Sequence, residues 1–589
     1  MLKFSNSSLQ SLRKVRIVGG LRYHSQSANA SSKSAETKHH VGELTDFIEK
    51  WTPDVFRNVG VGLAASSAAA AVAIGPVTGL SMAAFTALYW KVGLDDMNQH
   101  ASTIRRNFPF LGNLRFILES LRPEIRQYFI ESDKDGAPFD RQHRTIVYQR
   151  AKEASDLLPF GTRKDVYEEN YEFAAHSMWP TVATLEKSRV MIGGPECKKP
   201  YSSSILNVSG MSYGALSENA VLALSSAAKM GNFYHNTGEG GMSRFHLEGG
   251  GDLVWNVGTG YFGCGTGTLK RVFDEKMFAD NAQRDNCKMI ELKLSQGAKP
   301  SHGGMLPKAK ISPAIAEARG LKFPPEGDCN SPARHSAFDT PEGMMNFIAK
   351  LRLLSGGKPV GFKLCLGRPE EFAALVKAML TTGITPDFIT VDGAEGGTGA
   401  APPEFSNSVG MPMAEGLTLV NGILIGAGLR DKVKVIAAGK VLTGFSVVKT
   451  LAMGADVCNS ARAMLFALGC IQSHKCNTNT CPTGITTQDP RLMKGLHVPS
   501  KAERVKNYQE KTVHVALEIT GALGYDTPDK ISGKDVLRRI RNHGLRDFNE
   551  IYPWITIAPN SLVDRTARKE FLNVYDGKGS HDHYLFETV

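Results

Sequence analysis

Residues 289–297 read MIELKLSQG, an apolar run with polar residues at every second position that ends at a glycine. Six more short apolar runs end in glycine-rich or polar turns, and helical segments separate them: ILNVSG (205–210), FYHNTGEGG (233–241), VGFKLCLG (360–367), FITVDGAEGG (388–397), VKVIAAG (433–439) and ADVCNS (455–460). Strands that alternate with helices are typical of parallel α/β folds. We therefore predict an α/β fold, a (β/α)8 TIM barrel, whose active site forms from the loops after the strands. A doubly wound open sheet would show the same alternation and is the alternative.

Length, composition and charge restrict the class of protein. At 589 residues the chain exceeds the roughly 250–300 residues at which one hydrophobic core stops growing, so several segments are expected. The 42% hydrophobic and 22% charged residues are typical of a folded protein. Most of the net charge of +11 comes from residues 1–40, which hold seven Lys or Arg and one acidic residue. The remaining charge is too small and too scattered for a nucleic-acid-binding protein, so we exclude nucleic acid as a partner.

Residues 1–40 have the composition of a transit peptide. The first 35 residues are rich in Ser and Arg and contain no Asp or Glu, and they can form a cationic amphipathic helix. This composition is that of a mitochondrial or plastid transit peptide and predicts import into an organelle, and we expect a mitochondrial protein. An ordinary N-terminal tail is the alternative.

A long uncharged segment follows the transit peptide. Residues 58–90 contain no charged side chain, and about 20 apolar residues suffice to span a bilayer. We therefore expect a candidate transmembrane helix over 58–90, within a membrane-proximal segment 41–110, and possible anchoring to a membrane. A buried or interfacial helix pair, broken at Gly75-Pro76, is the alternative.

Three more segments complete the predicted organisation. Apolar residues recur at helical spacing after residue 110, which predicts a helical adaptor over 111–194. The barrel is expected over 195–495. A C-terminal helical extension is expected over 496–589.

Three of the nine cysteines lie close together. Cys470, Cys476 and Cys481 fall within twelve residues, and Pro482 follows the last of them. Thiolates are the usual ligands of iron-sulfur clusters, and a Cys-Pro ending recurs in such runs. Three thiolates leave one corner of a cubane without a local ligand, which favours a three-iron cluster. Zinc with His474 as a fourth ligand is the alternative, although these spacings are wider than in a Cys-x2-Cys knuckle.

Several ordered motifs carry a resemblance to a known family. They are SGMSYGALS (209–217), NTGEGG (236–241), LSQGAKP (294–300) and GGTGAAP (396–402), followed by the three cysteines. Over residues 195–495 the chain resembles the flavin-binding synthase domain of the glutamate synthase family. The resemblance implies a barrel that binds FMN and a 3Fe-4S cluster, in which reduced flavin converts 2-iminoglutarate, formed from 2-oxoglutarate and ammonia, to glutamate.

The resemblance also assigns substrate residues. Alternation along MIELKLSQGAKP puts Glu291, Lys293 and Ser295 on one face of the strand, with Gln296 and Lys299 in the loop beyond. By resemblance Gln296, Lys299 and Arg319 contact the substrate carboxylates, and Lys293 lies close by. Cations and amide donors suit a dicarboxylate, although one or two of these lysines could instead pair with structural carboxylates.

Glu239 lies in a glycine-rich loop, where a carboxylate can hold or transfer the proton of an ammonium or imine. A helix-capping role is the alternative for this residue. Lys363 ends the strand VGFKL, and a cation at that position can stabilise the negative charge of a reduced flavin.

The remaining flavin contacts are expected at the first barrel loop and at the ends of the last two strands. FMN phosphate is expected on backbone N–H groups at helix N-termini after those two strands. Two motifs depart from the family: its Asp-Gly-Gly reads Ala-Gly-Lys (438–440), and its Gly-x-Gly reads Asn-Ser-Ala (459–461), so Lys440 and Arg462 are expected to supply compensating charge. The predicted cofactor-binding residues are Ser209, Gly210, Met211, Lys363, Gly439, Gly444, Ser460 and Arg462.

Three departures concern the substrate. His302 stands where the family has an acidic residue, Met305 where it has Gln, and Ser336-Ala337 where it has His-Asp. A related flavin oxidoreductase acting on another amino or oxo acid is therefore an alternative. A membrane-tethered electron-transfer subunit without turnover is another, because residues 58–90 are uncharged.

The sequence also lacks features of full-length glutamate synthases. It shows neither an N-terminal glutaminase domain with a cysteine nucleophile nor a C-terminal β-helix, so free ammonia, a partner amidotransferase or a different amine must supply nitrogen. It has no convincing dinucleotide-binding G-x-G-x-x-G unit. Electrons are therefore expected from a ferredoxin-like protein or another protein donor.

Overall fold

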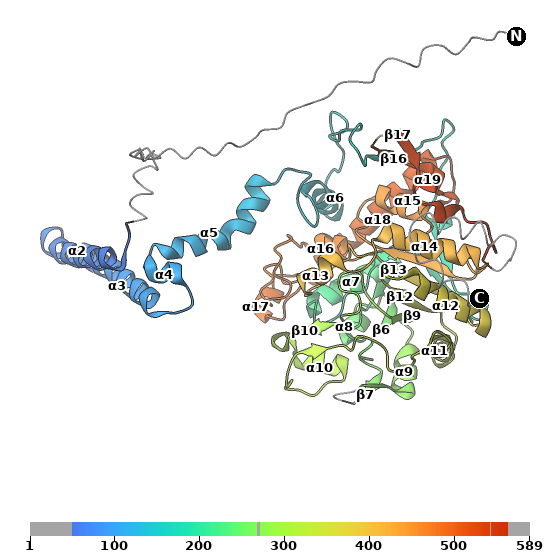
Figure 1. Ribbon diagram of the computed structural model, residues 1–589, viewed down its shortest axis with the longest axis horizontal. Helices are drawn as coiled ribbons and strands as arrows, with labels where there is room; N and C mark the ends of the chain where they lie inside the picture. Colours follow the sequence, from blue (N-terminus) through green and yellow to red (C-terminus); the bar gives the residue numbers. More distant parts are fainter. Residues whose placement is uncertain (1–49, 268–270, 542–543, 563–589) are drawn as a thin grey trace, which may run out of the picture. The chain divides into compact units, whose positions relative to one another are not determined.

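A computed structural model of the chain describes residues 50–267, 271–541 and 544–562 (Figure 1). The chain divides into two compact units, residues 1–125 and 126–589, and each is described by itself. The expected transit peptide over residues 1–40 lies outside the described residues. The division at residue 125 falls inside the predicted adaptor, 111–194.

The first unit is built on a helical hairpin of α2 (Pro53–Ala73) and α3 (Pro76–Asn98). The chain turns at Gly75, whose φ of +134° suits glycine alone, and Pro76 then begins α3 with the fixed φ that the first helical position requires. The uncharged segment 58–90 is therefore divided between two helices, and the expectation of one continuous helix there is wrong. The break falls at Gly75-Pro76, as in the alternative.

Small residues let the two helices of the hairpin pack closely. A Cβ atom at Gly60 would come within 2.6 Å of the Trp90 ring, and one at Gly93 would overlap the ring of Phe56. Ser67 and Thr86 hydrogen-bond across the interface at 3.0 Å. Two further helices follow in this unit: α4 (Thr103–Asn107) and α5 (Gly112–Ile125).

The second unit contains a closed barrel of eight parallel strands (Figure 1). They are β4 (Leu206–Val208), β5 (Tyr234–Asn236), β6 (Asp252–Val257), β9 (Cys287–Lys293), β12 (Val360–Leu364), β13 (Phe388–Asp392), β14 (Lys434–Ala438) and β15 (Val457–Ser460). Strand β15 pairs with β4, which closes the barrel, so the (β/α)8 fold is confirmed and the open sheet is wrong. Strand β6, DLVWNV, is the one strand that the seven quoted runs do not include.

Helices surround the barrel. Those between the strands are α7 (Glu218–Gly231), α8 (Arg244–Glu248), α9 (Glu275–Ala282), α10 (Pro313–Arg319), α11 (Pro341–Leu354), α12 (Pro369–Thr382), α13 (Pro403–Ser408), α14 (Met413–Gly426) and α15 (Gly444–Ala452). After β15 come α16 (Arg462–Leu468), α17 (Pro490–Met493) and α18 (Val498–Ala522). Helix α18 packs against both α7 and α15, so it fills the last place in the ring and belongs to the barrel. The predicted barrel boundary at residue 495 is therefore too early.

A small hairpin closes the N-terminal end of the barrel. Strands β2 (Val190–Ile192) and β3 (Tyr201–Ser203) pair antiparallel. Ile192 and Tyr201 form one buried cluster with residues from the starts of the barrel strands: Tyr234, Val254, Met289, Phe388, Ile436 and Val457. Because this end is filled with apolar side chains, a ligand can enter only from the carboxyl ends of the strands.

The segments before and after the barrel meet in a small sheet. Strand β16 (Val536–Ile540) pairs antiparallel with β1 (Glu172–Ala174) and with β17 (Gly544–Asp547). The described part of the predicted C-terminal extension, 496–541 and 544–562, is thus a helix followed by strands and the short helix α19 (Phe548–Ile551). The adaptor holds η1 (Arg126–Ile130) and α6 (Arg141–Ala151) besides β1. The prediction that either segment is entirely helical is wrong, because the backbone N–H and C=O groups of β1 and β16 hydrogen-bond to one another. Short strand pairs in loops complete the fold: β7 (Gly265–Thr266) with β8 (Val272–Phe273), and β10 (Met305–Leu306) with β11 (Cys329–Asn330).

Candidate functional site

The centre of the barrel holds a fully hydrogen-bonded carboxylate. Glu291 on β9 is 1% exposed, and its Oε1 accepts hydrogen bonds from Asn236 Nδ2 at 2.8 Å and Asn256 Nδ2 at 2.6 Å. Its Oε2 accepts one from Thr390 Oγ1 at 2.7 Å. This polar layer separates the apolar bottom of the barrel from the charged residues at its mouth.

Above this layer, Lys293 connects the end of β9 to the glycine-rich loop after β5. Its Nζ lies 3.0 Å from Glu239 Oε2 and donates a hydrogen bond to Gln296 Oε1 at 2.7 Å. Burial opposes ionisation of Glu239, but the charges of Lys293, Arg319 and Lys299 outweigh it and lower the pKa of this carboxyl. Glu239 is therefore ionised at neutral pH.

Lys299 and Arg319 occupy different places around Glu239. Lys299 is buried and donates to the Ala400 carbonyl at 2.6 Å; burial lowers its pKa, and the charge of Glu239 partly offsets that effect. Arg319, at the end of α10, donates to the Tyr213 carbonyl at 3.2 Å, and its guanidinium lies 4.8 Å from the Phe262 ring centre. Three cations thus surround one carboxylate, which leaves an excess of positive charge that suits an anionic ligand.

A cavity of about 620 Å³ opens above these residues. Gly210, Met211, Glu239, Lys293, Gln296, Lys299 and Lys363 border it on the barrel side, and Cys470, Cys476 and Cys481 border it on the other. Its volume is within the range of small-molecule and cofactor sites. The structure brings together every predicted catalytic residue except Arg319, which lies behind the glycine-rich loop and does not border the cavity. The expected direct contact of Arg319 with a substrate carboxylate is therefore not supported.

Lys363 is held in place by a carboxylate on the next strand. Its Nζ lies 3.0 Å from Asp392 Oδ2, which also accepts a hydrogen bond from Gly297 N at 3.0 Å. Burial alone would lower the pKa of Lys363, but Asp392 and Glu291 raise it above its ordinary value. Lys363 is therefore a permanent, fixed cation at the floor of the cavity.

A second, smaller cavity of about 70 Å³ lies at the ends of β14 and β15. Ser209, Gly439, Lys440, Ser460 and Arg462 are among its lining residues. Burial lowers the pKa of Arg462 to about 10, although the charges of Asp392 and Glu395 oppose this, and burial and the charge of Arg462 lower the pKa of Lys440. Neither cation forms an ion pair with a carboxylate within the described part of the chain. This cavity therefore offers two cations to an anion.

Gly444 does not border this cavity. A Cβ atom at this position would come within 2.7 Å of the Ala516 backbone nitrogen on α18. The first turn of α15 is also capped internally, because Ser446 N donates to Thr443 Oγ1 at 3.1 Å. Gly444 thus permits α15 and α18 to pack closely, and its predicted role as a cofactor-binding residue is not supported.

The cysteine-bearing loop joins α16 to α17 without regular structure. Lys310 anchors it by donating to the Cys476 and Thr486 carbonyls at 2.7 and 2.8 Å. Burial raises the pKa of Cys470 to about 12, whereas hydrogen bonds from Thr483 and Thr486 outweigh burial and lower the pKa of Cys481. Within residues 50–267, 271–541 and 544–562, no three His, Cys, Asp or Glu side chains are grouped closely enough to hold a metal ion. The three thiols share a cavity but do not converge on a ready-made ligand set.

The positions that depart from the family motifs are not equivalent. Met305 borders the main cavity, and the His302 ring packs edge-on against Phe405, with ring centres 5.0 Å apart. Ser336 and Ala337 instead support the loop, since Ser336 Oγ donates to the Arg271 carbonyl and Ala337 N to the Tyr261 hydroxyl. Only the first two positions lie near the site.

Sequence reasoning missed two residues of the site. Asp392, which orients Lys363, is the last residue of the strand FITVD, so its place at the carboxyl end of a predicted strand was an available signal. Phe139 packs under the guanidinium of Arg462 at 4.6 Å and borders both cavities, yet it lies far before the barrel. No pattern in the sequence links it to the site.

The fold and the site together define an α/β-barrel enzyme with a cationic, glycine-lined active-site mouth. The family described as "Conserved region in glutamate synthase" matches residues 163–526, and the chain belongs to the glutamate synthase family. It is 36% identical over 493 residues to the glutamate synthase large subunit-like protein YerD of Bacillus subtilis, which covers 77% of this chain and 93% of YerD. Like the glutamate synthases, the chain is an oxidoreductase of the class that acts on CH–NH2 donors.

Other relatives are matched over part of their length. The chain is 33% identical over 335 residues to the archaeal-type glutamate synthase (NADPH) of Thermotoga neapolitana, which covers 56% of this chain and 62% of that protein. It thus spans less than two thirds of that relative. Among solved structures, a mandelate oxidase with an FMN adduct aligns over 69% of this chain and 96% of that chain, with a TM-score of 0.36 and 15% identity.

Proposed function

We propose that the chain is an FMN-dependent glutamate synthase that reduces 2-iminoglutarate, formed from 2-oxoglutarate and ammonia, to glutamate. The observation that carries the proposal is the cavity of about 620 Å³, in which Lys293, Gln296 and Lys299 lie beside an ionised Glu239 and a fixed Lys363. The cations and the amide of Lys293, Lys299 and Gln296 suit the carboxylates of a dicarboxylate. The cation of Lys363 suits the negative charge of a reduced flavin.

The residues present fit FMN. Lys440 and Arg462, which have no carboxylate partner in the described part of the chain, would hold the phosphate in the smaller cavity, with Ser209 and Ser460 beside them. Gly210, Met211 and Lys363 border the larger cavity where the ring would lie. When bound, FMN supplies the hydride that reduces the C=N bond. Lys363 stabilises the negative charge that remains on a reduced flavin.

The substrate end of the cavity binds and orients the oxo acid. Lys293, Lys299 and Gln296 bind the carboxylates of the oxo acid. The ionised Glu239 holds the proton of the ammonium or iminium nitrogen, because its lowered pKa keeps it an acceptor. Arg319 acts on Glu239 through its charge.

We further propose that Cys470, Cys476 and Cys481 hold a 3Fe-4S cluster that receives electrons from a ferredoxin-like or other protein donor. Their spacing, the Cys-Pro ending and their shared border on the main cavity support this. Because the thiols do not converge as they stand, binding of the cluster requires the loop to adjust. Iron and sulfide analysis of anaerobically purified protein tests the proposal; a protein with full flavin and no iron would contradict it.

The proposed activity is tested by an anaerobic assay of purified protein with 2-oxoglutarate, ammonia and dithionite. The expected product is glutamate, formed only when both substrates are present. A second candidate, a flavin oxidoreductase on another amino or oxo acid, is favoured by Met305 and His302 near the site. In a screen of oxo acids with ammonia, faster reoxidation by an acid other than 2-oxoglutarate would favour that candidate.

We also propose that the α2–α3 hairpin anchors the protein to a mitochondrial membrane. Ser67 bonds Thr86 between the two helices, and Phe56 and Tyr89 are buried there as well. The outward face is apolar: Val61, Val72, Ile74, Val77, Leu80, Phe85 and Leu88 are exposed. Among the described residues, only α2 meets the length and hydropathy expected of a membrane span, with a mean hydropathy of 1.3. A helical hairpin would leave both of its ends on the same side of the membrane.

Liposome flotation of the full chain tests the anchor. Co-flotation that survives high salt is expected, because apolar burial is insensitive to screening. A chain that floats only at low salt, or not at all, would contradict the proposal.

If flavin is present and reducible but no oxo acid reoxidises it, the membrane-tethered electron-transfer subunit becomes the better description.

A further inference from the structure

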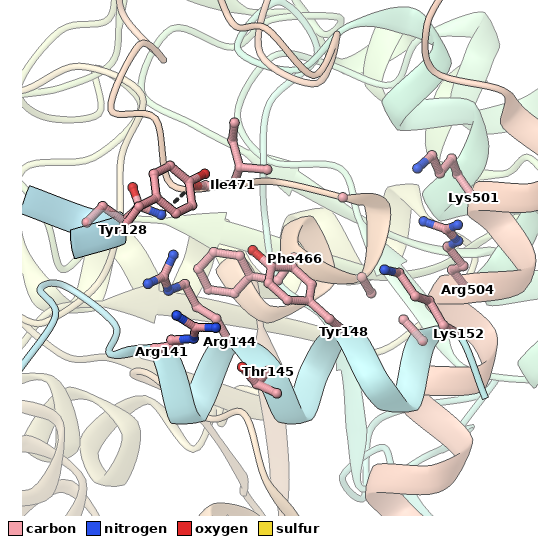
Figure 2. A pocket seen from close by; sticks show the side chains of 14 residues that line it. Tyr128, Arg141, Arg144, Thr145, Tyr148, Lys152, Phe466, Ile471, Lys501 and Arg504 are labelled. Carbon is pink, nitrogen blue, oxygen red and sulfur yellow. Dashed lines mark hydrogen bonds between the residues drawn. The ribbon is translucent and has the colours of Figure 1, made fainter. Parts of the chain in front are cut away.

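A separate pocket of about 440 Å³ lies between α6, α16 and α18 in the second unit (Figure 2). None of the residues assigned to substrate or cofactor borders it. Five cations line it and no carboxylate does: Arg141, Arg144, Lys152, Lys501 and Arg504. The cations gather at its two ends, which Figure 2 shows, with Lys152, Lys501 and Arg504 at one end and Arg141 and Arg144 at the other.

Most of these cations form no salt bridge. Arg141 lies 3.7 Å from Asp133, and no other of the five forms a salt bridge with a described residue. Arg144 is only 6% exposed, and its Nε donates to the Asp140 backbone carbonyl at 3.4 Å. Burial and the charges of Arg504 and Lys152 together lower the pKa of Lys501. Like charges that converge in a hollow favour an anion over water.

Aromatic rings line the space between the two ends. Tyr148 and Phe466 pack edge to face, with ring centres 6.0 Å apart, and Tyr128 is 56% exposed at the margin (Figure 2). Arg144 and Lys152 are eight residues apart on or beside α6, about 12 Å along a helix. The pocket therefore suits an elongated ligand that is anionic at one end and flat and aromatic toward the other.

The pocket is joined to the cysteine-bearing loop. Tyr148 Oη donates to the Cys470 carbonyl at 2.6 Å, and Gln127 Nε2 donates to the Ile471 carbonyl at 3.0 Å, the bond drawn in Figure 2. A ligand that orders Tyr148 would therefore also order the loop at Cys470.

We propose that this pocket binds a nucleoside phosphate, with its phosphates on Lys152, Lys501 and Arg504 and its base against Tyr128. A concave site with three cations at one end, and with an exposed ring beside two arginines at the other, matches the two parts of such a molecule. An acidic protein surface would match the charge alone, because it has no part that fills the hollow. The inference does not depend on the glutamate-forming activity.

Calorimetric titration of the full flavin-loaded chain with ATP, adenosine and inorganic pyrophosphate, at physiological salt, tests the proposal. ATP is expected to bind at least tenfold more tightly than adenosine or pyrophosphate alone. K501A/R504A should weaken ATP at least tenfold, and Y128A should weaken ATP but not pyrophosphate. K506A/K511A, which removes the same charge from the same helix outside the pocket, should leave ATP binding unchanged.

Three outcomes would overturn the proposal. If ATP does not bind, or if K506A/K511A weakens it as much as K501A/R504A does, the pocket is not a nucleotide site. If pyrophosphate binds as tightly as ATP, the site recognises an anion without a base. If K501A/R504A weakens only the binding of an acidic protein such as ferredoxin, the surface is a docking site. Unchanged flavin absorbance and melting temperature of each variant show that it is folded.

Discussion

Lys363 and Glu239 both lie in buried ion pairs, but the two pairs have different consequences for the chemistry. Asp392 fixes Lys363 as a cation below the cavity, whereas three cations fix Glu239 as an anion beside it. The first arrangement suits the charge of a reduced cofactor, and the second suits a protonated nitrogen. Each can be tested with a substitution that removes one charge.

For Lys363→Met we expect turnover to fall on the order of 100-fold, the usual effect of losing one preorganised electrostatic contact. The flavin reduction potential should fall too, because a reduced flavin loses a stabilising charge. Unpaired Asp392 should destabilise the fold by roughly 3 kcal/mol. The double variant K363M/D392N should regain stability in urea unfolding but not turnover; recovery of both would show that Lys363 is only structural.

For Glu239→Gln the informative measurement is unfolding free energy against pH. The folded-state pKa of Glu239 lies below its ordinary value of 4.5, so its stabilising contribution is complete above that pH and is lost as pH falls through the folded pKa. We expect the wild type to exceed the variant by roughly 3 kcal/mol at pH 7. That difference should shrink below pH 4.5. A difference that grows on acidification would show that the folded-state pKa is raised.

Single residues differ in how far the sequence predicts them. The alternation along β9 puts Glu291 and Lys293 inside the barrel, because side chains alternate strictly along a strand. The burial of Arg319 behind a loop and the arrival of Phe139 from the preceding segment depend on tertiary packing, which leaves no local pattern. The sequence also does not predict that Gly444 serves helix packing, because a glycine beside a strand end fits both anion binding and close packing of helices.

Helix α15 and the loop before it allow the effects of helix packing and of cofactor binding to be measured separately, since Gly444 contacts α18 and Lys440 lines the smaller cavity. Gly444→Val should cost roughly 1–3 kcal/mol through overpacking against α18 and leave FMN affinity unchanged. Lys440→Ala should instead weaken FMN binding about tenfold and leave the melting temperature unchanged. Flavin fluorescence titration and thermal unfolding of both variants check the pair. A loss of FMN affinity in the Gly444 variant alone would restore its predicted role.

The hairpin offers a matched pair of glycines. Gly60 faces Trp90 across the interface, whereas a Cβ atom at Gly62 would meet nothing within 4 Å. Gly60→Leu should separate α2 from α3 at a cost of roughly 1–3 kcal/mol, with about ten- to hundredfold faster amide exchange. Gly62→Leu should leave exchange in residues 53–98 unchanged. Equal effects of the two would contradict the packing described.

Strands with a strong hydrophobic pattern can be predicted from the sequence, whereas strands that pair with a distant segment cannot. Seven of the barrel strands follow from apolar runs that end in polar turns, and β6 escaped although it is equally buried. Strands β1 and β16 are separated by more than 350 residues and pair only in the folded chain, so a local reading favoured helix. The break at Gly75-Pro76 was visible in the sequence, but the hydropathy of the segment favoured one span.

At the scale of the whole molecule, the chain combines a catalytic barrel with a separate hairpin unit. The family assignment agrees with the motifs quoted from the barrel. The family motifs predict the cavity better than the substrate, because the departure at Met305 changes its border.

We propose that reduced flavin in this barrel is oxidised by 2-oxoglutarate together with ammonia. Single-turnover mixing of anaerobically reduced protein with both substrates tests this reaction directly. We expect recovery of the oxidised flavin spectrum with one glutamate formed per flavin, and no recovery with either substrate alone. A flavin that stays reduced with both substrates, yet is reoxidised by another oxo acid or by a protein acceptor, would contradict it.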